Sequence, residues 1–363
     1  MKAHRVLKIP MNGPSDLSGV EAELERQGIS ADRIKAVMCM TEGDGFARGY
    51  ATLAFSNFFN RKLDWPVNEV ARRIPLIMIG GCSGLVSPYA ALFVEDPRLD
   101  GDSAEPRLSI GVGTTADYDI EEFGTLAMVD RIADGIRKAM ADAGIEARDV
   151  HNVQIKAPWP QGPDLIKAQK QGKKVVTTDT WRAGMLARGG SALAASVAIG
   201  EIDRKKLKDL DIAANWTLWS NVGSASSGDE RTNFAIIVMG NSKKSRSPYR
   251  IGHAALRDGI DVAGVYEALA SAGIKASGPL PLSSDNPVDH VFLKSAVDGR
   301  PECRGRRHVL TSDYLGPYSW LIGKAVIHAT VAGIVGDPMM QVSGGFEHQG
   351  PPGGGHLAVI AKV

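Results

Sequence analysis

The chain has 363 residues, of which 44% are hydrophobic and 23% are charged, and its net charge is +1. This neutrality argues against a general electrostatic role with nucleic acid or an anionic membrane. The N-terminal residues lack the apolar core of a signal peptide, no run of about 18 apolar residues occurs, and the three cysteines form no metal-ligand spacing and no disulfide framework. We therefore expect a cytoplasmic protein with no membrane or nucleic-acid partner.

Three stretches of the chain repeat the same order of predicted elements. Each begins with a short apolar strand, starting at Arg5, Arg107 and Tyr249, and continues with a helical stretch that ends in Gly-Ile. A second strand follows, then an Ala-rich helix opened by a basic residue, then a third strand that runs into small residues, and a closing aliphatic strand. This order predicts a sheet covered on one face by helices, three times over.

We expect three domains, at residues 1–104, 105–245 and 246–363, which fits the usual size of a domain. The predicted fold class is α+β, with three similar sheet-plus-helix domains. Open repetition would leave sheet edges unpaired, so the domains are expected to close around a pseudo-threefold axis. A central active site on that axis would receive the same position from each domain.

Matching positions of the three copies carry the chemistry. They are Met40, Lys156 and Lys294 at the end of the second strand, Ile79, Ser224 and Ser343 on the third strand, Gly80, Ala225 and Gly344 directly after it, and Arg48, Arg188 and Lys324 at the start of the Ala-rich helix. Two copies therefore offer a Lys–Ser pair, and the first offers the apolar Met40 and Ile79 at these two positions and keeps only the basic Arg48.

A Lys–Ser pair can perform nucleophilic catalysis. A serine hydroxyl becomes a useful nucleophile when a neighbouring base takes its proton, and a buried lysine can be that base because burial disfavours the ammonium form. Ser224 is the predicted nucleophile and Lys156 its base, although Ser343 with Lys294 remains an alternative. Small residues after each serine leave backbone N–H groups available to a substrate oxygen, and the cations of the Ala-rich helices could bind substrate carbonyl groups.

The chain resembles the cyanuric acid hydrolase/barbiturase family of ring-opening amidohydrolases over nearly its whole length. The resemblance is carried by VSGGFEHQGPPGGGHLAVIAKV at the C-terminus, TEGDG after Met40, GGCSGLVSP after Ile79, VTTDT and RGGSAL in the second repeat, and SASSG. It implies hydrolysis of a small cyclic amide, with no cofactor required for catalysis, and assembly into a homotetramer. It also implies a structural divalent cation in the C-terminal loop, which would be held by Gln349, Pro351 and Gly354.

The first repeat departs from the family pattern, which has a lysine at Met40 and a serine at Ile79, and at Lys324 the family has an arginine. An apolar wall would leave one edge of a symmetric polar ring without partners, at a cost of about 1–3 kcal/mol for each unsatisfied group. We therefore expect a cyclic imide, ureide or lactam that is less symmetric than cyanuric acid. The alternatives are cyanuric acid or barbiturate hydrolysis itself, lyase or isomerase chemistry on a carbonyl compound, and a binding protein without catalysis.

Overall fold

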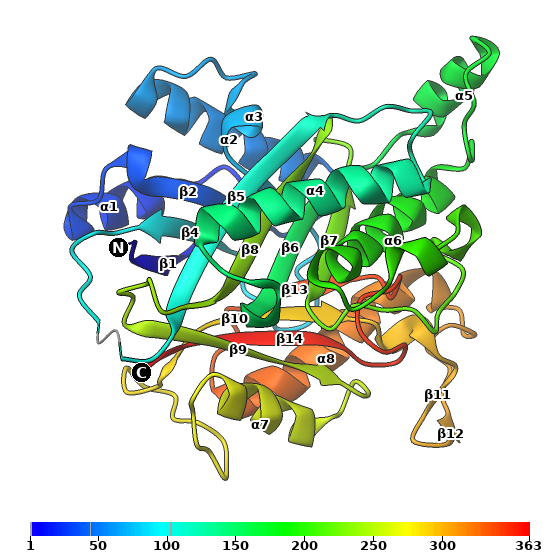
Figure 1. Cartoon of the computed structure of the whole chain (residues 1–363). Coiled ribbons are helices and arrows are strands. Elements are labelled where there is room, and N and C mark those ends of the chain that lie inside the picture. The colour runs from blue at the N-terminus through cyan, green and yellow to red at the C-terminus, as the bar shows by residue number, and fades with distance from the viewer. Residues whose placement is uncertain (1, 44, 102–103) are drawn as a thin grey trace.

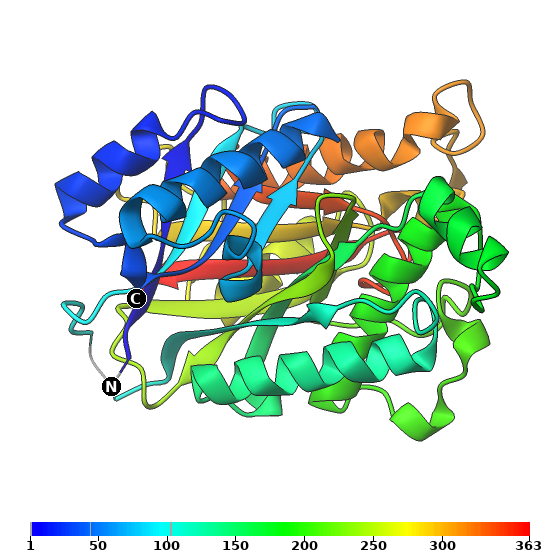
Figure 2. The same cartoon turned by 90° about the horizontal axis from the view of Figure 1, so that it is seen from above.

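The computed structural model describes residues 2–43, 45–101 and 104–363. Asp44, which belongs to the TEGDG motif, and Asp102, which lies just before the expected boundary between the first and second domains, lie outside the described residues. Helices cover the outside of the molecule and the strands of three sheets occupy its middle (Figures 1 and 2).

The first domain contains one sheet with the strand order β1-β4-β2-β3. Its elements are β1 (His4–Pro10), α1 (Ser18–Gln27), η1 (Ala31–Arg33), β2 (Ile34–Met40), α2 (Phe46–Leu63), α3 (Val70–Arg73), β3 (Leu76–Ile79) and β4 (Tyr89–Glu95).

The second domain contains a sheet with the strand order β5-β8-β6-β7. Its elements are β5 (Arg107–Asp117), α4 (Leu126–Ala143), η2 (Ala147–Asp149), β6 (Val150–Pro158), α5 (Gly162–Lys170), α6 (Thr180–Ile199), η3 (Arg204–Lys206), η4 (Asp209–Asp211), β7 (Gly223–Gly228) and β8 (Asn233–Ser242).

The third domain contains a sheet with the strand order β9-β14-β10-β13 and a small hairpin of β11 and β12. Its elements are β9 (Tyr249–Leu256), α7 (Val262–Ser271), β10 (Val288–Ser295), η5 (Val297–Gly299), β11 (Glu302–Cys303), β12 (Arg306–Arg307), η6 (Gly316–Tyr318), α8 (Ser319–Val335), β13 (Gln341–Gly344) and β14 (Gly355–Lys362).

The three four-stranded sheets share one topology, in which the first strand of the repeat pairs with the fourth, the fourth with the second, and the second with the third. The second and third strands run parallel, and the other pairs are antiparallel. This confirms the predicted α+β class and the predicted order of strands and helices.

The Gly-Ile signals end helices as the sequence indicates. Gly28 and Gly144 follow α1 and α4 with φ of 60° and 64°, a left-handed conformation that glycine adopts without a Cβ clash. The expectation that a basic residue opens each Ala-rich helix is wrong in the second and third domains. There α6 begins at Thr180, capped by the side chain of Asp179, and α8 begins at Ser319, so Arg188 and Lys324 lie inside the helices.

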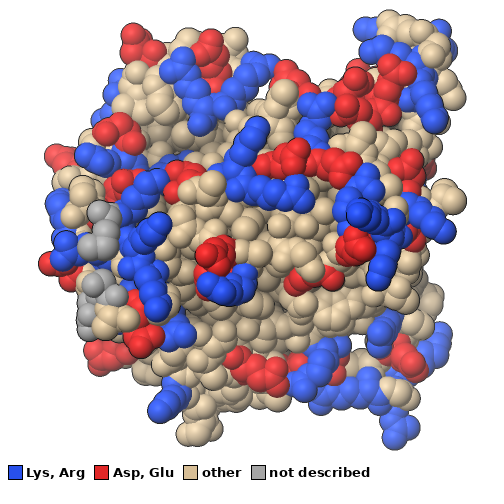
Figure 3. Space-filling view, in the orientation of Figure 1, with Lys and Arg blue, Asp and Glu red and all other residues tan. Residues whose placement is uncertain are grey.

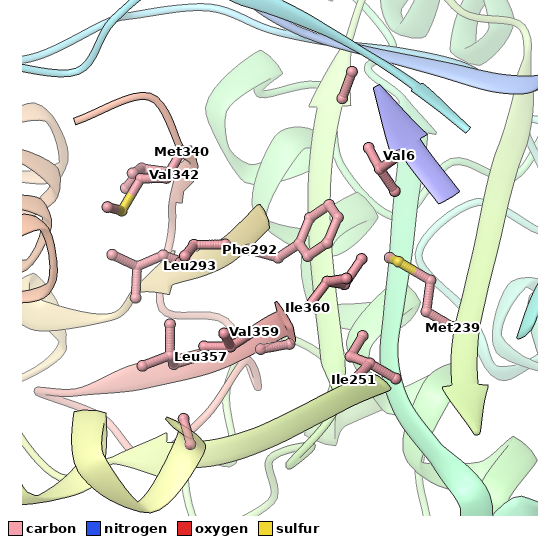
Figure 4. Packing of buried hydrophobic residues seen from close by; sticks show 14 of the residues in the cluster. Val6, Met239, Ile251, Phe292, Leu293, Met340, Val342, Leu357, Val359 and Ile360 are labelled. Atoms are coloured by element: carbon pink, nitrogen blue, oxygen red, sulfur yellow. The ribbon is translucent and has the colours of Figure 1, made fainter. Parts of the chain in front are cut away.

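Strand alternation divides the buried residues into separate cores. Along β8, Phe234, Ile236 and Val238 face the helices of their own domain, whereas Ile237 and Met239 face the centre of the molecule. The central core collects residues from all three sheets, including Val6, Met239, Ile251, Phe292 and Ile360 (Figure 4). The inner faces of the three sheets thus pack against one another, and side chains at the inner strand ends meet.

Charges of both signs are interspersed on the face shown in Figure 3, in keeping with the net charge of +1. Among the described residues, one helical segment, Gly316–Val335, is long and apolar enough by composition to cross a membrane. This is weak evidence for a membrane span, because Ile327, Val331 and Val335 of this segment pack in the central core.

Candidate active site

A cavity of about 240 Å³ lies where the three domains meet. Its walls include residues from each domain, among them Ile79 and Gly80 from the first, Lys156 and Arg188 from the second, and Ser343 from the third. The structure therefore brings together most of the positions that the repeats single out.

Strand register identifies the equivalent positions of the three repeats. Met40 of β2 is paired with Ile79 of β3, and Lys294 of β10 is paired with Ser343 of β13. In the second domain the partner of Lys156 on β7 is Ser226, whereas Ser224 is paired with Gln154.

The residue of the second domain that corresponds to Ile79 and Ser343 is therefore Ser226. The prediction that Ser224 occupies this position is wrong by two residues. Strand residues two apart point to the same face, so Ser224 lies on the inner face but one step behind the cavity, and it is not among the described residues that line it. Ser226 does line the cavity. Its Oγ is buried and has no hydrogen-bond partner among the described residues.

The backbone positions shift in the same way. Gly80 and Gly344 line the cavity, as expected, and the equivalent residue of the second domain is Ser227 rather than Ala225. The Ala225 N–H donates a hydrogen bond to Gln349 Oε1, and its side chain packs in the core of the second domain. Ala225 is thus unable to offer its N–H to a substrate.

Each lysine is held by acceptors from more than one domain. Lys156 Nζ donates to the carbonyl oxygens of Met78 at 2.6 Å and Ser227 at 3.2 Å, and it lies 3.0 Å from Glu230 Oε1. Burial lowers the pKa of Lys156 to about 8, although the Glu230 carboxylate raises it. At this pKa a substantial fraction of the amine is neutral close to physiological pH.

Lys294 lies directly behind Ser343. Its Nζ donates to Ser343 Oγ at 3.1 Å and to the carbonyl oxygens of Ala225 and Gly344 at 2.7 and 2.6 Å. Burial lowers the pKa of Lys294 well below the usual value for lysine. Ser343 Oγ is therefore already an acceptor, unlike Ser226 Oγ.

Two arginines make buried ion pairs across domain boundaries. Arg48 Nε lies 3.2 Å from Glu230 Oε2, and its Nη2 lies 3.1 Å from Asp229. Arg188 Nε and Nη2 bind the two carboxylate oxygens of Glu347 at 3.0 and 2.6 Å, and its Nη1 donates to Ser227 Oγ at 3.1 Å. The pair of Arg188 with Glu347 is bidentate, whereas Arg48 contacts two different carboxylates, and each arrangement holds its guanidinium group in a fixed orientation beside the cavity.

Aromatic side chains form much of the remaining wall. Trp159, Trp181, Trp320 and Phe346 line the cavity together with Met185. Such flat apolar surfaces favour a substrate that has an apolar or planar edge. Of the expected apolar pair in the first domain, Ile79 lines the cavity, but Met40 is fully buried behind it in the central core.

The comparisons with known proteins agree with this architecture. Residues 5–362 match the family described as amidohydrolase ring-opening protein. The chain belongs to this family of ring-opening amidohydrolases. The resemblance that the sequence motifs indicate is therefore confirmed.

Individual relatives match over the full length. The chain is 56% identical to a cyclic amide hydrolase of Rhodococcus sp, over 97% of this chain and all of the relative. It is 39% identical to a cyanuric acid amidohydrolase of Enterobacter cloacae, over 99% of both chains. A solved cyanuric acid hydrolase structure superposes with a TM-score of 0.92 at 36% identity and covers both chains completely.

Sequence reasoning missed several residues of this amidohydrolase site. Ser226, Ser227 and Glu230 were overlooked, and Glu347 was not assigned a role. A signal existed, because Ser226 and Ser343 each precede a glycine by two residues and a glutamate by four, at Glu230 and Glu347. The tryptophans come from separate loops and helices, and no repeat relates them.

Asp298 is a further carboxyl group at the cavity. Burial, and then the neighbouring Glu347 carboxylate, raise the pKa of Asp298 to about 6. Its Oδ1 is buried without a hydrogen-bond partner among the described residues. At neutral pH this group is mostly ionised, and near pH 6 half of it carries a proton.

The oxygens predicted to bind a structural cation already accept other hydrogen bonds. Gln349 Oε1 accepts from Ala225 N, Pro351 O accepts from Gly354 N at 3.0 Å, and Gly354 O accepts from Ala296 N at 2.8 Å. Within the described ranges, no group of three or more His, Cys, Asp or Glu side chains could hold a metal ion. Each of these carbonyl oxygens keeps a second lone pair, so a cation there stays a prediction, and no step of the proposed reaction depends on it.

Proposed function

We propose that the protein opens the ring of a small cyclic amide with Ser226 as nucleophile and Lys156 as general base. The observation that carries this assignment is the register pairing of Lys156 with Ser226 at the cavity wall, where the serine hydroxyl has no competing partner among the described residues. Residues paired on adjacent strands have side chains about 5 Å apart on the same face, which is close enough for proton transfer after a small adjustment on substrate binding.

The proposed reaction has two stages. Ser226 Oγ attacks a ring carbonyl carbon while its proton passes to Lys156 Nζ, and the tetrahedral intermediate then collapses as the ring C–N bond breaks and the nitrogen takes the proton from Lys156. The acyl group remains attached to Ser226. Water then attacks this ester, with Lys156 again accepting a proton, and releases the open-chain carboxylic acid and the free serine.

The cations beside the cavity stabilise the charge that develops on the carbonyl oxygen. Arg188 is fixed by Glu347, so it is oriented before the substrate arrives, which is the condition for efficient electrostatic stabilisation. Lys294 holds Ser343 by a hydrogen bond at 3.1 Å, and this pair is proposed to position the ring rather than to attack it.

The proposed substrate is less symmetric than cyanuric acid. Ile79 replaces a polar group on one side of the cavity, and the aromatic walls favour an apolar edge. Cyclic imides, hydantoins, pyrimidinediones and lactams are therefore better candidates than a ring with three equivalent polar edges. A homo-oligomer is also proposed, and its mass can be measured by light scattering.

The test is ring opening of such a panel by the wild-type protein and by three serine variants. Ser226→Ala should reduce kcat/KM by at least about 10³-fold, as expected for loss of a nucleophile, whereas Ser224→Ala should stay within a few-fold of wild type and Ser343→Ala should lie between them. Trapping of an acyl group on Ser226 would support the assignment. Full activity of Ser226→Ala would refute it.

A further inference from the structure

The three helix-borne cations that line the cavity, Arg48, Arg188 and Lys324, differ in the negative charges beside them. Each one reaches from a helix of its own domain to the strand-end loop of the next domain. Arg48 reaches Glu230, and Arg188 reaches Glu347. Both glutamates stand four residues after the serine position of their repeat, Ser226 and Ser343.

The third contact lacks a carboxylate among the described residues. In the first domain the residue four positions after Ile79 is Ser83, whose Oγ donates to Gly81 O at 3.0 Å. Lys324 occupies the place of the arginine, and its Nζ donates to the carbonyl oxygens of Gly80 at 3.1 Å and Gly81 at 2.5 Å. Across residues 2–43, 45–101 and 104–363, no carboxylate oxygen lies within 4.0 Å of Lys324 Nζ.

This ammonium group is almost completely buried. Lys324 is 1% exposed and lines the cavity, and the ring of Trp320 lies 5.6 Å from its Nζ. A buried cation without an ionic partner is costly, and two carbonyl dipoles with one aromatic ring offset that cost only in part, so burial lowers the pKa of Lys324 to about 8. A carboxylate bound beside Nζ would raise this pKa again and hold the side chain as the ammonium. An ammonium group has three N–H donors, and the two carbonyl groups use two of them.

The unbalanced charge faces the same cavity as Ser226. Arg48 and Arg188, whose charges are offset by carboxylates, suit neutral carbonyl oxygens of a substrate. Lys324 instead suits an oxygen that carries a full negative charge, because a charge-assisted hydrogen bond in a dry site is stronger than one to a neutral acceptor. A negatively charged group of the substrate would then take the place beside Lys324 that a glutamate takes beside Arg48 and Arg188, because residue 83 is a serine.

We propose that Lys324 binds a carboxylate attached to the substrate ring, so that the enzyme acts on a cyclic amide that carries an exocyclic carboxylate. This inference rests on the proposed ring-opening function, since it concerns the substrate of the same cavity. The proposed substrate differs from one that matches an apolar wall alone. On the side of the cavity that Ile79 forms, Lys324 is also present, with its Nζ bound to the carbonyl oxygens of Gly80 and Gly81.

The first experiment measures binding without turnover. Isothermal titration calorimetry on the Ser226→Ala protein would compare a lactam ring carboxylate with the matching carboxamide, and barbiturate would serve as a ring with an ionised ring oxygen. The carboxylate should bind about 10- to 100-fold more tightly than the carboxamide. Adding Lys324→Gln should remove this difference, and Lys324→Arg should largely retain it.

A second variant tests the same idea from the other side of the contact. Ser83→Glu in the Ser226→Ala background restores a carboxylate next to Lys324 and should abolish the preference for the ring carboxylate. Ser83→Gln has a similar size without the charge and should retain it. Circular dichroism of each variant shows that it folds.

The outcomes separate this inference from the proposed function. A preference for the ring carboxylate that disappears in both Lys324→Gln and Ser83→Glu supports the inference, even if the wild-type enzyme opens none of these rings and the proposed function fails. Equal affinity for carboxylate and carboxamide overturns it, and so does a preference that neither variant alters. Selective binding of barbiturate without binding of the ring carboxylate also overturns it.

Discussion

Replacement of Glu230 by glutamine should move the pH dependence of the reaction toward acid. Lys156 must be neutral to accept the proton of Ser226, so kcat/KM should rise with pH up to the pKa of Lys156, which is about 8. The Glu230 carboxylate lies 3.0 Å from Lys156 Nζ and favours the charged ammonium. Glu230→Gln removes that negative charge, lowers the pKa of Lys156 and increases the neutral fraction below pH 8.

The size of the shift follows from the separation of the charges. Two unit charges 3.0 Å apart interact by about 5 kcal/mol at an effective dielectric constant of about 20. One pKa unit requires about 1.4 kcal/mol, so a shift of at least about one pH unit is expected even if most of the interaction is screened. At pH 7 such a shift would raise the neutral fraction of Lys156 from about 10% to about 50%.

The assay is a profile of kcat/KM between pH 6 and pH 10 on a ring that the wild-type protein opens. Asp229→Asn is the matched control, because Asp229 also contacts Arg48 but is half-exposed and makes no hydrogen bond or ion pair with Lys156 among the described residues. Its profile should coincide with that of the wild type. An unchanged or alkaline-shifted midpoint for Glu230→Gln would refute the assignment of Lys156 as the base.

Three further predictions concern stability; the first two can be checked by urea unfolding, and the third by the yield of soluble protein and its activity. Glu347→Gln leaves the buried charge of Arg188 without its partner and should lower the free energy of unfolding by roughly 3–5 kcal/mol. Burial raises the pKa of Asp289 to about 6. Above pH 6 the folded protein therefore holds an unfavourable buried carboxylate, whereas below about pH 4 the group is protonated in both the folded and the unfolded state. Asp289→Asn should stabilise the protein at pH 8, by at most about 3 kcal/mol, and leave its stability unchanged at pH 4. Gly355→Ala would place a Cβ 1.7 Å from the Lys294 carbonyl oxygen at a φ of 154°, and soluble, fully active protein from this variant would contradict the geometry.

The repeated order of strands and helices could be predicted from the sequence because local signals determine it. Apolar strands, amphipathic helices and the glycines after α1 and α4 are visible within short windows. The serine position could not be predicted in the same way, because SASSG offers three serines within four residues and the choice among them depends on the register of β6 against β7. Ser224 and Ser226 lie on the same face of the strand, so the two-residue periodicity of a strand cannot distinguish between them.

The ion pairs across domain boundaries depend on closure of the three domains. Arg188 and Glu347 are separated by more than a hundred residues in sequence, and only the packing of three inner sheet faces brings them to 2.6 Å. Helix starts were less predictable than helix ends, since the caps of α6 and α8 lie several residues before the basic side chains that mark these helices.

The first domain shows why a repeat can lose its catalytic side chains and still contribute to the site. Strand β3 and the two residues directly after it orient two cations through backbone carbonyl groups: Met78 O accepts from Lys156 Nζ at 2.6 Å, and Gly80 O and Gly81 O accept from Lys324 Nζ. Backbone acceptors do not depend on which side chain follows, so Ile79 can replace a polar residue without releasing either lysine. In the proposed reaction, the apolar Ile79 therefore changes what the cavity binds on this side while Lys156 stays in place opposite Ser226, so substrate preference can diverge with the same proposed Lys156–Ser226 chemistry.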